Sequence, residues 1–349
     1  MSADGADAMG EMTPEMTLMI TGAAGYVGRA TVAAARAAGH DVVAVVRLAG
    51  VVPDTWADDE GIEVVEADLS DPACIPALDM EGIDAVIHAA ASLSGDDAEQ
   101  ARSTMNGTLH LVQAIADSEL SPRLVLVSSI SVYSGMGLLA NPMIDETSML
   151  ERNPSARDAY CRAKLEQEDI CVDAAQELTL DLRLMRLGAV FGPERLWNAH
   201  VGPGIGPFVL RLNDGGEIPL CHVNHAANAL VRAAELPVPQ GPDGPIEVLN
   251  LIDDDLPDRI RFLNAMARTG WPKIIVPVHW RLFDLLASAL TWLPGLPGLL
   301  RRETLRYRMA SAFYPNARLK ERLGLPATPA FEQAFAQSLV PTTPTEDDA

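Results

Sequence analysis

Short apolar runs alternate with amphipathic segments through the first half of the chain. The apolar runs, whose lengths suit strands, are residues 18–20, 41–46, 62–65, 85–88, 124–128 and 182–187. The longer segments with helical spacing of apolar positions are residues 29–38, 103–118 and 160–178. The valine-rich run at 41–46 is typical of strands buried on both faces of a parallel sheet. The alternation predicts an α/β fold with a doubly wound parallel sheet and right-handed crossovers.

Glycine and proline interrupt this pattern from about residue 191, and clusters of tryptophan, proline and leucine follow. A helix and a strand within residues 226–252 are predicted to return to the sheet. We therefore expect a sheet domain at 17–190 that includes this returning segment, and a smaller C-terminal domain formed mainly by residues 191–340. Sites in such folds lie beyond the carboxyl ends of the strands, so the smaller domain should bind substrate and cap the site.

The chain of 349 residues is acidic, with 48 Asp and Glu against 26 Lys and Arg and a formal net charge of −22. This balance argues against a nucleic-acid partner, which requires a positive protein surface. A hydrophobic fraction of 48% excludes disorder throughout the chain. The four cysteines are far apart, which predicts a reduced, cytoplasmic compartment and no disulfide framework. We interpret Cys221, His222 and His225 as ordinary turn and helix residues, so no metal is expected.

Two segments bear on targeting and membranes. Residues 1–16 are acidic and lack the basic start and apolar run of a signal peptide, so we expect a disordered leader. The longest apolar stretch, residues 282–300, contains one aspartate and two prolines, and only about 12 residues precede the first proline, whereas a bilayer span needs roughly 20. No transmembrane span is therefore expected. We interpret the stretch as a buried amphipathic helix; the alternative is a helix lying on a membrane surface, because two arginines follow it.

A glycine-rich loop follows the first predicted strand in the run TGAAGYVG. Gly22 would let the chain turn sharply off the strand, Gly25 would let the backbone approach a pyrophosphate, and Gly28 would allow tight packing of the next helix. Free N–H groups and the helix dipole at the start of the helix predicted from about residue 29 favour an anion, and Tyr26 and Val27 before it are further candidate cofactor contacts. A strand, a glycine loop, a helix and a second strand in this order predict dinucleotide binding.

Tyr160 and Lys164 form a Y-x-x-x-K pattern on a predicted helix. Residues four apart lie one turn from each other on one helix face. A phenol with a pKa near 10 is a poor base at neutral pH, and a neighbouring ammonium would favour the phenolate. Lys164 could also donate a hydrogen bond to a cofactor ribose. The pair therefore predicts proton exchange at a substrate hydroxyl.

A serine should complete this group at the end of the strand at 124–128. Ser129 is our candidate, and it would donate a hydrogen bond to the substrate oxygen as charge develops there. Ser128 and Ser131 are rivals that we interpret as residues bonded to the backbone.

These motifs together resemble the extended short-chain dehydrogenase/reductase superfamily, which includes the NAD-dependent epimerases and dehydratases and has a Rossmann sheet. The resemblance covers roughly residues 17–330. It implies that Asp68 and Leu69 hold the adenine ring, and that the H-A-A-A segment after the fourth strand lies along the cofactor. Further residues implied to contact the cofactor are Ala89, Ala90, Asn106, Lys164 and Val190. The sequence departs from the family at Leu187, where proline is usual, and in the shortened spacing around Asn106.

The resemblance extends to the 3β-hydroxysteroid dehydrogenase-like branch, on the layout of the C-terminal region. Membership of this branch implies a hydrophobic alcohol or ketone as substrate. Trp197, Asn198 and His200, in the Gly/Pro-rich loop, are candidate substrate contacts. Many of the C-terminal aromatic residues should instead form the core of the small domain.

Arg47 decides the cofactor that we expect. A carboxylate at the end of the second strand would bind the ribose 2′-hydroxyl of NAD, whereas a cation suits the 2′-phosphate of NADP. Val46 stands where NAD-preferring relatives carry aspartate, and Arg47 follows it. We therefore expect NADP(H) ahead of NAD(H).

The expected function is an oxidoreductase that transfers hydride between NADP(H) and a secondary alcohol or ketone by a Ser-Tyr-Lys mechanism. One alternative is an NAD-dependent nucleotide-sugar epimerase, and another is a catalytically silent dinucleotide-binding sensor. A sugar dehydratase is disfavoured because Ile130 and Ser131 occupy the positions of its Asp-Glu pair. The resemblance alone implies a homodimer formed through the helices at 103–118 and 160–178.

Overall fold

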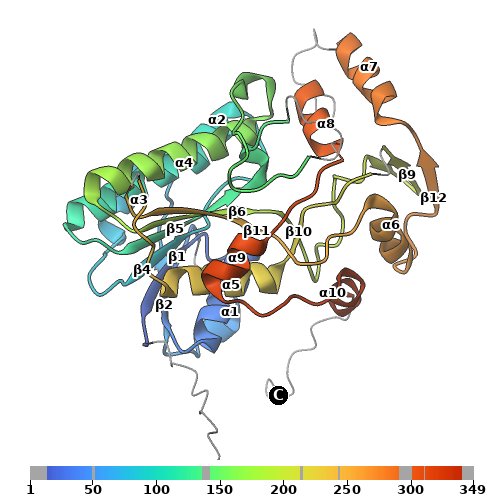
Figure 1. Ribbon diagram of the computed structural model, residues 1–349. Coiled ribbons are helices and arrows are strands. Elements are labelled where there is room, and N and C mark those ends of the chain that lie inside the picture. Colours follow the sequence, from blue (N-terminus) through green and yellow to red (C-terminus); the bar gives the residue numbers. More distant parts are fainter. Residues whose placement is uncertain are drawn as a thin grey trace, which may run out of the picture.

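The computed structural model describes residues 14–48, 52–135, 142–212, 215–242, 244–290, 301–309 and 311–339. Within them the chain forms a central sheet covered by helices and a smaller C-terminal module beside it (Figure 1). Most of the expected leader and residues 291–300 of the apolar stretch lie outside the described residues.

The seven strands of the central sheet are all parallel, in the order β11-β6-β5-β4-β1-β2-β3. They are β1 (Thr17–Thr21), β2 (Asp41–Val46), β3 (Ile62–Glu66), β4 (Ala85–His88), β5 (Arg123–Ser129), β6 (Leu182–Leu187) and β11 (Ile246–Leu251). This confirms the predicted doubly wound parallel sheet. The order of the strands reverses between β1 and β4, and in such sheets the ligand crevice lies at this point.

Helices cover both faces of the sheet. Successive residues of β1 alternate between the faces: Leu18 and Ile20 join the core on one face, and Met19 joins the core on the other. The first face is covered by α1 (Tyr26–Ala37), α5 (Val223–Glu235) and α9 (Ala317–Leu323), and the second by α3 (Asn106–Ser118) and α4 (Ala159–Leu178). A short helix, α2 (Asp97–Gln100), and a π-helical turn, Ala101–Met105, precede α3, so the predicted helix at 103–118 starts as a π-turn.

The C-terminal module has two small sheets and four helices. Strands β7 (Ala189–Phe191) and β10 (Leu220–His222) pair in parallel, and β8 (Gly204–Ile205), β9 (Phe208–Arg211) and β12 (Ile274–Pro277) form the other sheet. The helices are α6 (Arg259–Ala267), α7 (Trp280–Leu290), α8 (Arg302–Met309) and α10 (Phe331–Ser338). A core of buried aromatic residues joins these elements, with Phe191, Phe262, Phe331 and Phe335 in contact.

A buried ion-pair network ties β11 into the sheet. Arg183 on β6 and Glu247 on β11 are 2.9 Å apart, with side chains only 1% and 5% exposed. The Arg183 guanidinium also donates hydrogen bonds to the carbonyl oxygens of Ala233 and Leu236 at the end of α5. Arg322 of α9 contacts the second carboxylate oxygen of Glu247 at 2.5 Å. The Glu247 carboxylate of β11 therefore binds both β6 and α9.

We expect Glu247→Gln to lower the free energy of unfolding by about 3 kcal/mol or more, because it leaves the Arg183 guanidinium buried without its counter-ion. Urea denaturation measures this loss. Glu63→Gln is the matched control, at an exposed position of β3, and should change stability by no more than about 0.5 kcal/mol. Equal stability of the two variants would contradict a structural role for the buried pair.

Candidate active site

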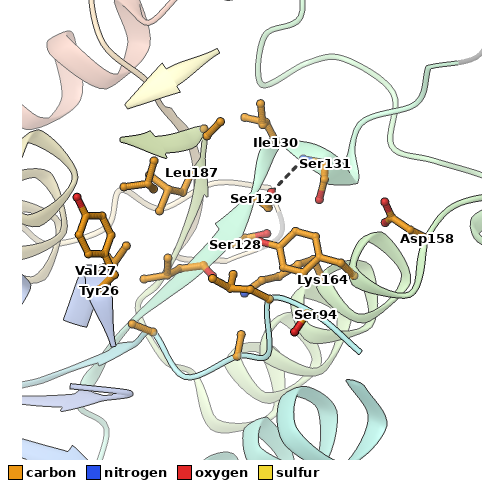
Figure 2. A pocket seen from close by; sticks show the side chains of 18 of the residues that line it. Tyr26, Val27, Ser94, Ser128, Ser129, Ile130, Ser131, Asp158, Lys164 and Leu187 are labelled. Carbon is orange, nitrogen blue, oxygen red and sulfur yellow. Dashed lines mark hydrogen bonds between the residues drawn. The ribbon is translucent and has the colours of Figure 1, made fainter. Parts of the chain in front are cut away.

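A cavity of about 680 Å³ lies at the carboxyl ends of the central strands, where the strand order reverses. Its walls come from the glycine loop after β1, the segment after β4, the end of β5, the start of α4 and the segment joining β6 to β7. Helix α8 adds Tyr307 and Arg308. Figure 2 shows Ser128 and Ser129 on β5 beside Lys164 of α4, with Tyr26 and Val27 across the cavity. One space therefore holds both the candidate cofactor residues and the candidate catalytic residues.

The glycine loop leaves room that any side chain would fill. Gly22 has φ +67°, and a Cβ built on it would lie 2.8 Å from the backbone of Ala90. A Cβ on Gly28 would lie 2.2 Å from the carbonyl oxygen of Gly22. Gly25 caps α1 without a side-chain hydrogen bond to the helix N–H groups, so the helix start can bind an anion. These residues fit a dinucleotide whose diphosphate lies against the start of α1.

Eight of the predicted cofactor residues line the cavity, and five lie outside its lining. The eight are Gly22, Gly25, Tyr26, Val27, Gly28, Ala89, Lys164 and Val190. The five are Arg47, Asp68, Leu69, Ala90 and Asn106.

Two of these five residues lie together beyond the ends of β2 and β3. The pKa of Asp68 is lowered, first by the hydrogen bond that the Ser70 N–H donates at 3.0 Å and further by the charge of Arg47. The Arg47 side chain is exposed. The cation is therefore near enough to the carboxylate to lower its pKa, and both residues follow strands next to β1 in the sheet.

Helix α3 presents threonines to the interior, and Asn106 is exposed. Thr104 and Thr108 are one turn apart and buried, whereas Asn106 lies half a turn from them. The structure thus places Asn106 away from the cavity, because the helix face that meets α4 and the sheet is set by positions 104 and 108.

The three predicted catalytic residues meet in the cavity. Ser129 ends β5, Tyr160 lies in the first turn of α4, and Lys164 follows one turn later. The Ser129 hydroxyl accepts a hydrogen bond from the Ser131 N–H at 3.2 Å, and it lies near enough to the Tyr160 phenol to lower the pKa of that phenol. The Nζ atom of Lys164 is 6.0 Å from the centre of the Tyr160 ring. Ser128 is engaged elsewhere, since its hydroxyl donates to the Glu168 carboxylate at 2.5 Å.

The pKa values differ in one respect from the expectation. Burial raises the pKa of Tyr160, and the Ser129 hydroxyl only partly opposes it. Burial also lowers the pKa of Lys164 to about 8, against the charge of Glu168. Desolvation is the largest cause of the shift in the Tyr160 pKa, and the cation that opposes it is Arg308, whereas we expected Lys164. At neutral pH the phenol is therefore held in its protonated form.

A chain of buried hydrogen bonds fixes the Lys164 amine. Nζ donates to the carbonyl oxygen of Val127 and to Oε1 of Gln167, both at 2.8 Å. The Gln167 amide donates to the Thr108 hydroxyl at 2.8 Å, and that hydroxyl also lies 2.9 Å from Nε2 of His88. Burial lowers the pKa of His88 to about 3, so its ring is neutral and adds no charge beside the ammonium.

Two residues of α4 that support this site were not predicted from the sequence. Gln167 and Glu168 lie three and four positions after Lys164, and this spacing on one helix face could have identified them. Glu168 receives both arms of the Arg186 guanidinium of β6, at 3.0 and 2.7 Å. Together they attach α4 to β5 and β6 directly beneath the candidate catalytic residues.

The three predicted substrate contacts have different surroundings in the structure. His200 lines the cavity, and burial lowers its pKa well below the usual value. Asn198 is buried and accepts hydrogen bonds from the His200 N–H and ring, at 2.9 and 2.7 Å. Trp197 packs edge-on against Trp271, with ring centres 4.8 Å apart, and belongs to the core of the C-terminal module. The substrate end of the cavity is instead completed by Arg308, which lies 3.6 Å from Asp158.

Cys221, His225 and Asp253 lie close together below β10. Their candidate ligand atoms are within 4.8 Å of one another. His225 contacts the Asp253 carboxylate at 2.7 Å, and burial raises the pKa of Cys221 well above its usual value. The His225–Asp253 contact joins α5 to the segment after β11.

Comparison with known families gives one match over most of the chain. The family model described as the NAD dependent epimerase/dehydratase family matches residues 18–244.

The curated relatives include reductases. "3-diazoavenalumate denitrifying reductase" of Streptomyces sp is 29% identical over 73% of this chain and 81% of that protein. A farnesyl dihydroquinoline oxide ketoreductase of Stigmatella aurantiaca is 28% identical over 73% of both chains. Cinnamoyl-CoA reductase 1 of Arabidopsis thaliana is 27% identical over 51% of this chain. The match spans about half the length of that plant reductase, 53%.

Solved structures with the same fold include sugar epimerases. UDP-glucose-4-epimerase from Stenotrophomonas maltophila, solved with bound NAD, superposes with a TM-score of 0.68 at 23% identity, covering 93% of this chain and 97% of that one. An epimerase from Campylobacter jejuni gives a TM-score of 0.70 at 16% identity, with 93% and 97% coverage. These likenesses establish the fold. Among the described residues, no helix is both long and apolar enough to cross a membrane.

The lowered pKa of Lys164 predicts a pH-dependent contribution to stability. The pKa is about 8 in the folded protein against 10.5 for a free lysine, so between these values the unfolded chain binds more protons. The free energy of unfolding should therefore rise with pH in this window, by roughly 3 kcal/mol relative to Lys164→Met. Denaturant titrations of both proteins from pH 7 to about 11 measure the difference. If the free energies of unfolding of the two proteins changed with pH in the same way, the Lys164 amine would not be desolvated in the folded protein.

Proposed function

The chain belongs to the NAD dependent epimerase/dehydratase family, an extended short-chain dehydrogenase/reductase family, and we propose that it is an NADP(H)-preferring ketoreductase. It would transfer hydride between the nicotinamide and a secondary alcohol or ketone of a hydrophobic substrate. The observation that carries this proposal is that Ser129, Tyr160 and Lys164 line the same cavity as the glycine loop, with Lys164 one helical turn after Tyr160.

The raised pKa of Tyr160 favours catalysis in the direction of reduction. A bound nicotinamide would supply the hydride to the carbonyl carbon. As negative charge grows on the carbonyl oxygen, Ser129 would donate a hydrogen bond to it and Tyr160 would give it a proton. A phenol that burial keeps protonated is suited to act as this acid. Lys164, held by Val127 and Gln167, has one remaining N–H bond with which to bind the cofactor ribose.

The walls near Tyr160 support a largely apolar substrate. Leu93, Ile130, Leu187 and Val190 line the cavity together with the ring of Tyr307. The curated relatives named above are reductases, which also favours this reaction over epimerisation. The nucleotide-sugar epimerase stays the second candidate, since neighbours of the same fold bind UDP-sugars. A reductase should release its cofactor readily, whereas tightly retained NAD would favour the epimerase.

We expect Tyr160→Phe to reduce turnover of an aromatic or alicyclic ketone at least about 100-fold, because the variant lacks the proton donor. NADPH binding should change by less than about twofold, since the phenol contacts the reacting oxygen and not the diphosphate. Steady-state kinetics and fluorescence titration of NADPH measure the two effects.

Tyr314→Phe serves as the control, because Tyr314 is buried outside the cavity lining. It should retain the activity of the natural sequence. Unchanged turnover in Tyr160→Phe would exclude this mechanism. Binding of NADPH without turnover of any ketone by the natural sequence would instead favour the sensor alternative.

The cofactor preference depends on Arg47. We expect NADPH to raise the melting temperature more than NADH at equal concentration, because the guanidinium can bind the 2′-phosphate. In Arg47→Ser the affinity for NADPH should fall about tenfold or more, with little change for NADH. Arg318→Ser, at an exposed position of α9, is the control and should leave both affinities unchanged. Equal stabilisation of the natural protein by both nucleotides would refute the preference.

A further inference from the structure

The small sheet of the C-terminal module has an apolar outer surface that continues onto α7. We call it the apolar face, and it consists of Ile205, Phe208, Ile274, Val276, Leu282 and Leu285. Their side chains are exposed by 37% to 67%. Contiguous apolar surface of this kind is uncommon on a monomer and marks an interaction site.

Strand pairing places four of these residues on one side of the sheet. Phe208 is paired with both Ile205 of β8 and Ile274 of β12, and Val276 follows Ile274 by two positions. Val209 and Ile275 point to the opposite side, where they pack in the core of the module. The inner side of the sheet is therefore filled, and the outer side has apolar residues without a covering layer among the described residues.

Helix α7 extends this surface. Its residues Trp280 and Phe283 pack against the cluster of Leu212, Leu305 and Met309, which joins the helix to α8 and to the chain just after β9. Leu282 and Leu285, at 54% and 65% exposure, lie away from that contact. Figure 1 shows α7 at the periphery of the module, away from the central sheet.

The segment that carries β12, α7 and α8 has a net positive charge, opposite in sign to that of the chain as a whole. Residues 268–308 contain seven Arg and Lys against two acids, in a chain whose formal net charge is −22. Arg268, Lys273 and Arg281 are exposed, and within the described chain none of them forms an ion pair. Asp284, the acid nearest in sequence to Lys273 and Arg281, is already paired with two arginines of α8.

We propose that the apolar face docks onto the surface of a bilayer that contains anionic phospholipids. Apolar side chains would enter the boundary between headgroups and acyl chains, while the three free cations contact lipid phosphates. A second copy of this chain is a poorer occupant, because two-fold pairing of the same surface would bring the cations of both copies together. The proposal concerns peripheral docking and does not depend on the proposed reaction.

Helix α8 connects this surface with the cavity. Arg302 and Arg306 bind Asp284 of α7 through its two carboxylate oxygens, at 2.8 and 3.2 Å. Tyr307 and Arg308 of the same helix line the cavity. A bilayer docked at the apolar face would therefore lie one helix away from the cavity that holds the candidate catalytic residues.

The test is co-sedimentation of the full chain with vesicles of phosphatidylcholine alone or with equimolar phosphatidylglycerol. We expect binding to the anionic vesicles that weakens at high salt. Leu282→Asp/Leu285→Asp should abolish binding to both kinds of vesicle. Lys273→Ser/Arg281→Ser should weaken binding to the anionic vesicles about thirtyfold and leave binding to pure phosphatidylcholine unchanged.

Leu109→Asp/Leu120→Asp is the matched control, with two equally exposed leucines changed on and just after α3. It should bind vesicles like the natural sequence. Thermal unfolding and NADPH binding establish that each variant is folded. Failure of the natural sequence to bind either kind of vesicle would overturn the proposal. An equal loss of vesicle binding in Leu109→Asp/Leu120→Asp and in Leu282→Asp/Leu285→Asp would overturn it too. A dimer that Leu282→Asp/Leu285→Asp converts to a monomer, without any vesicle binding, would assign the surface to a second copy instead.

Discussion

The buried ammonium of Lys164 is the constraint on which the candidate site depends. Removing this charge from water is costly, and the fold offsets the cost with the Val127 carbonyl and the Gln167 amide, while Glu168 lies on the next position of the same helix face. The amine can occupy only the position where these partners meet, which is beside the Tyr160 ring. The geometry of the site is thus set by the packing of α4 against β5, and a neutral His88 avoids adding a second charge beneath it.

The sheet topology brings the other parts of the site to this position. The strand order reverses between β1 and β4, and the close approach of Gly22 to Ala90 lets the loops after these two strands border one cavity. The chain then leaves the sheet after β6 and returns as β11, which the Arg183–Glu247 pair attaches to β6. This return anchors the C-terminal module, so that α8 adds Tyr307 and Arg308 to the cavity from residues far along the chain.

Local pattern was enough to predict the central sheet, and it was not enough for the module. Strands buried on both faces give unbroken apolar runs, and each predicted strand agrees with the structure to within one residue at each end. Strands β8, β9 and β12 have two to four residues, and β9 pairs with a partner more than 60 residues away, so they leave no periodic signal. Trp197 was likewise predicted as a substrate contact, because its packing against Trp271 arises only in the folded chain and leaves no signal in the local sequence. The Tyr160–Lys164 pair was predictable because both residues lie on one helix.

The position of α8 has a consequence for how the substrate end of the cavity is formed. This helix has eight residues, and its arginines bind α7 through a single carboxylate, Asp284. Tyr307 and Arg308 follow directly after Arg306, so the attachment of α7 and the cavity wall share one rigid element. Arg308 is further oriented by Asp158, which also caps α4 two residues before Tyr160. Helix α8 therefore links the contact with α7 to the start of α4. The shape of the cavity near Tyr160 depends on the Asp284 contact and on the Asp158 contact.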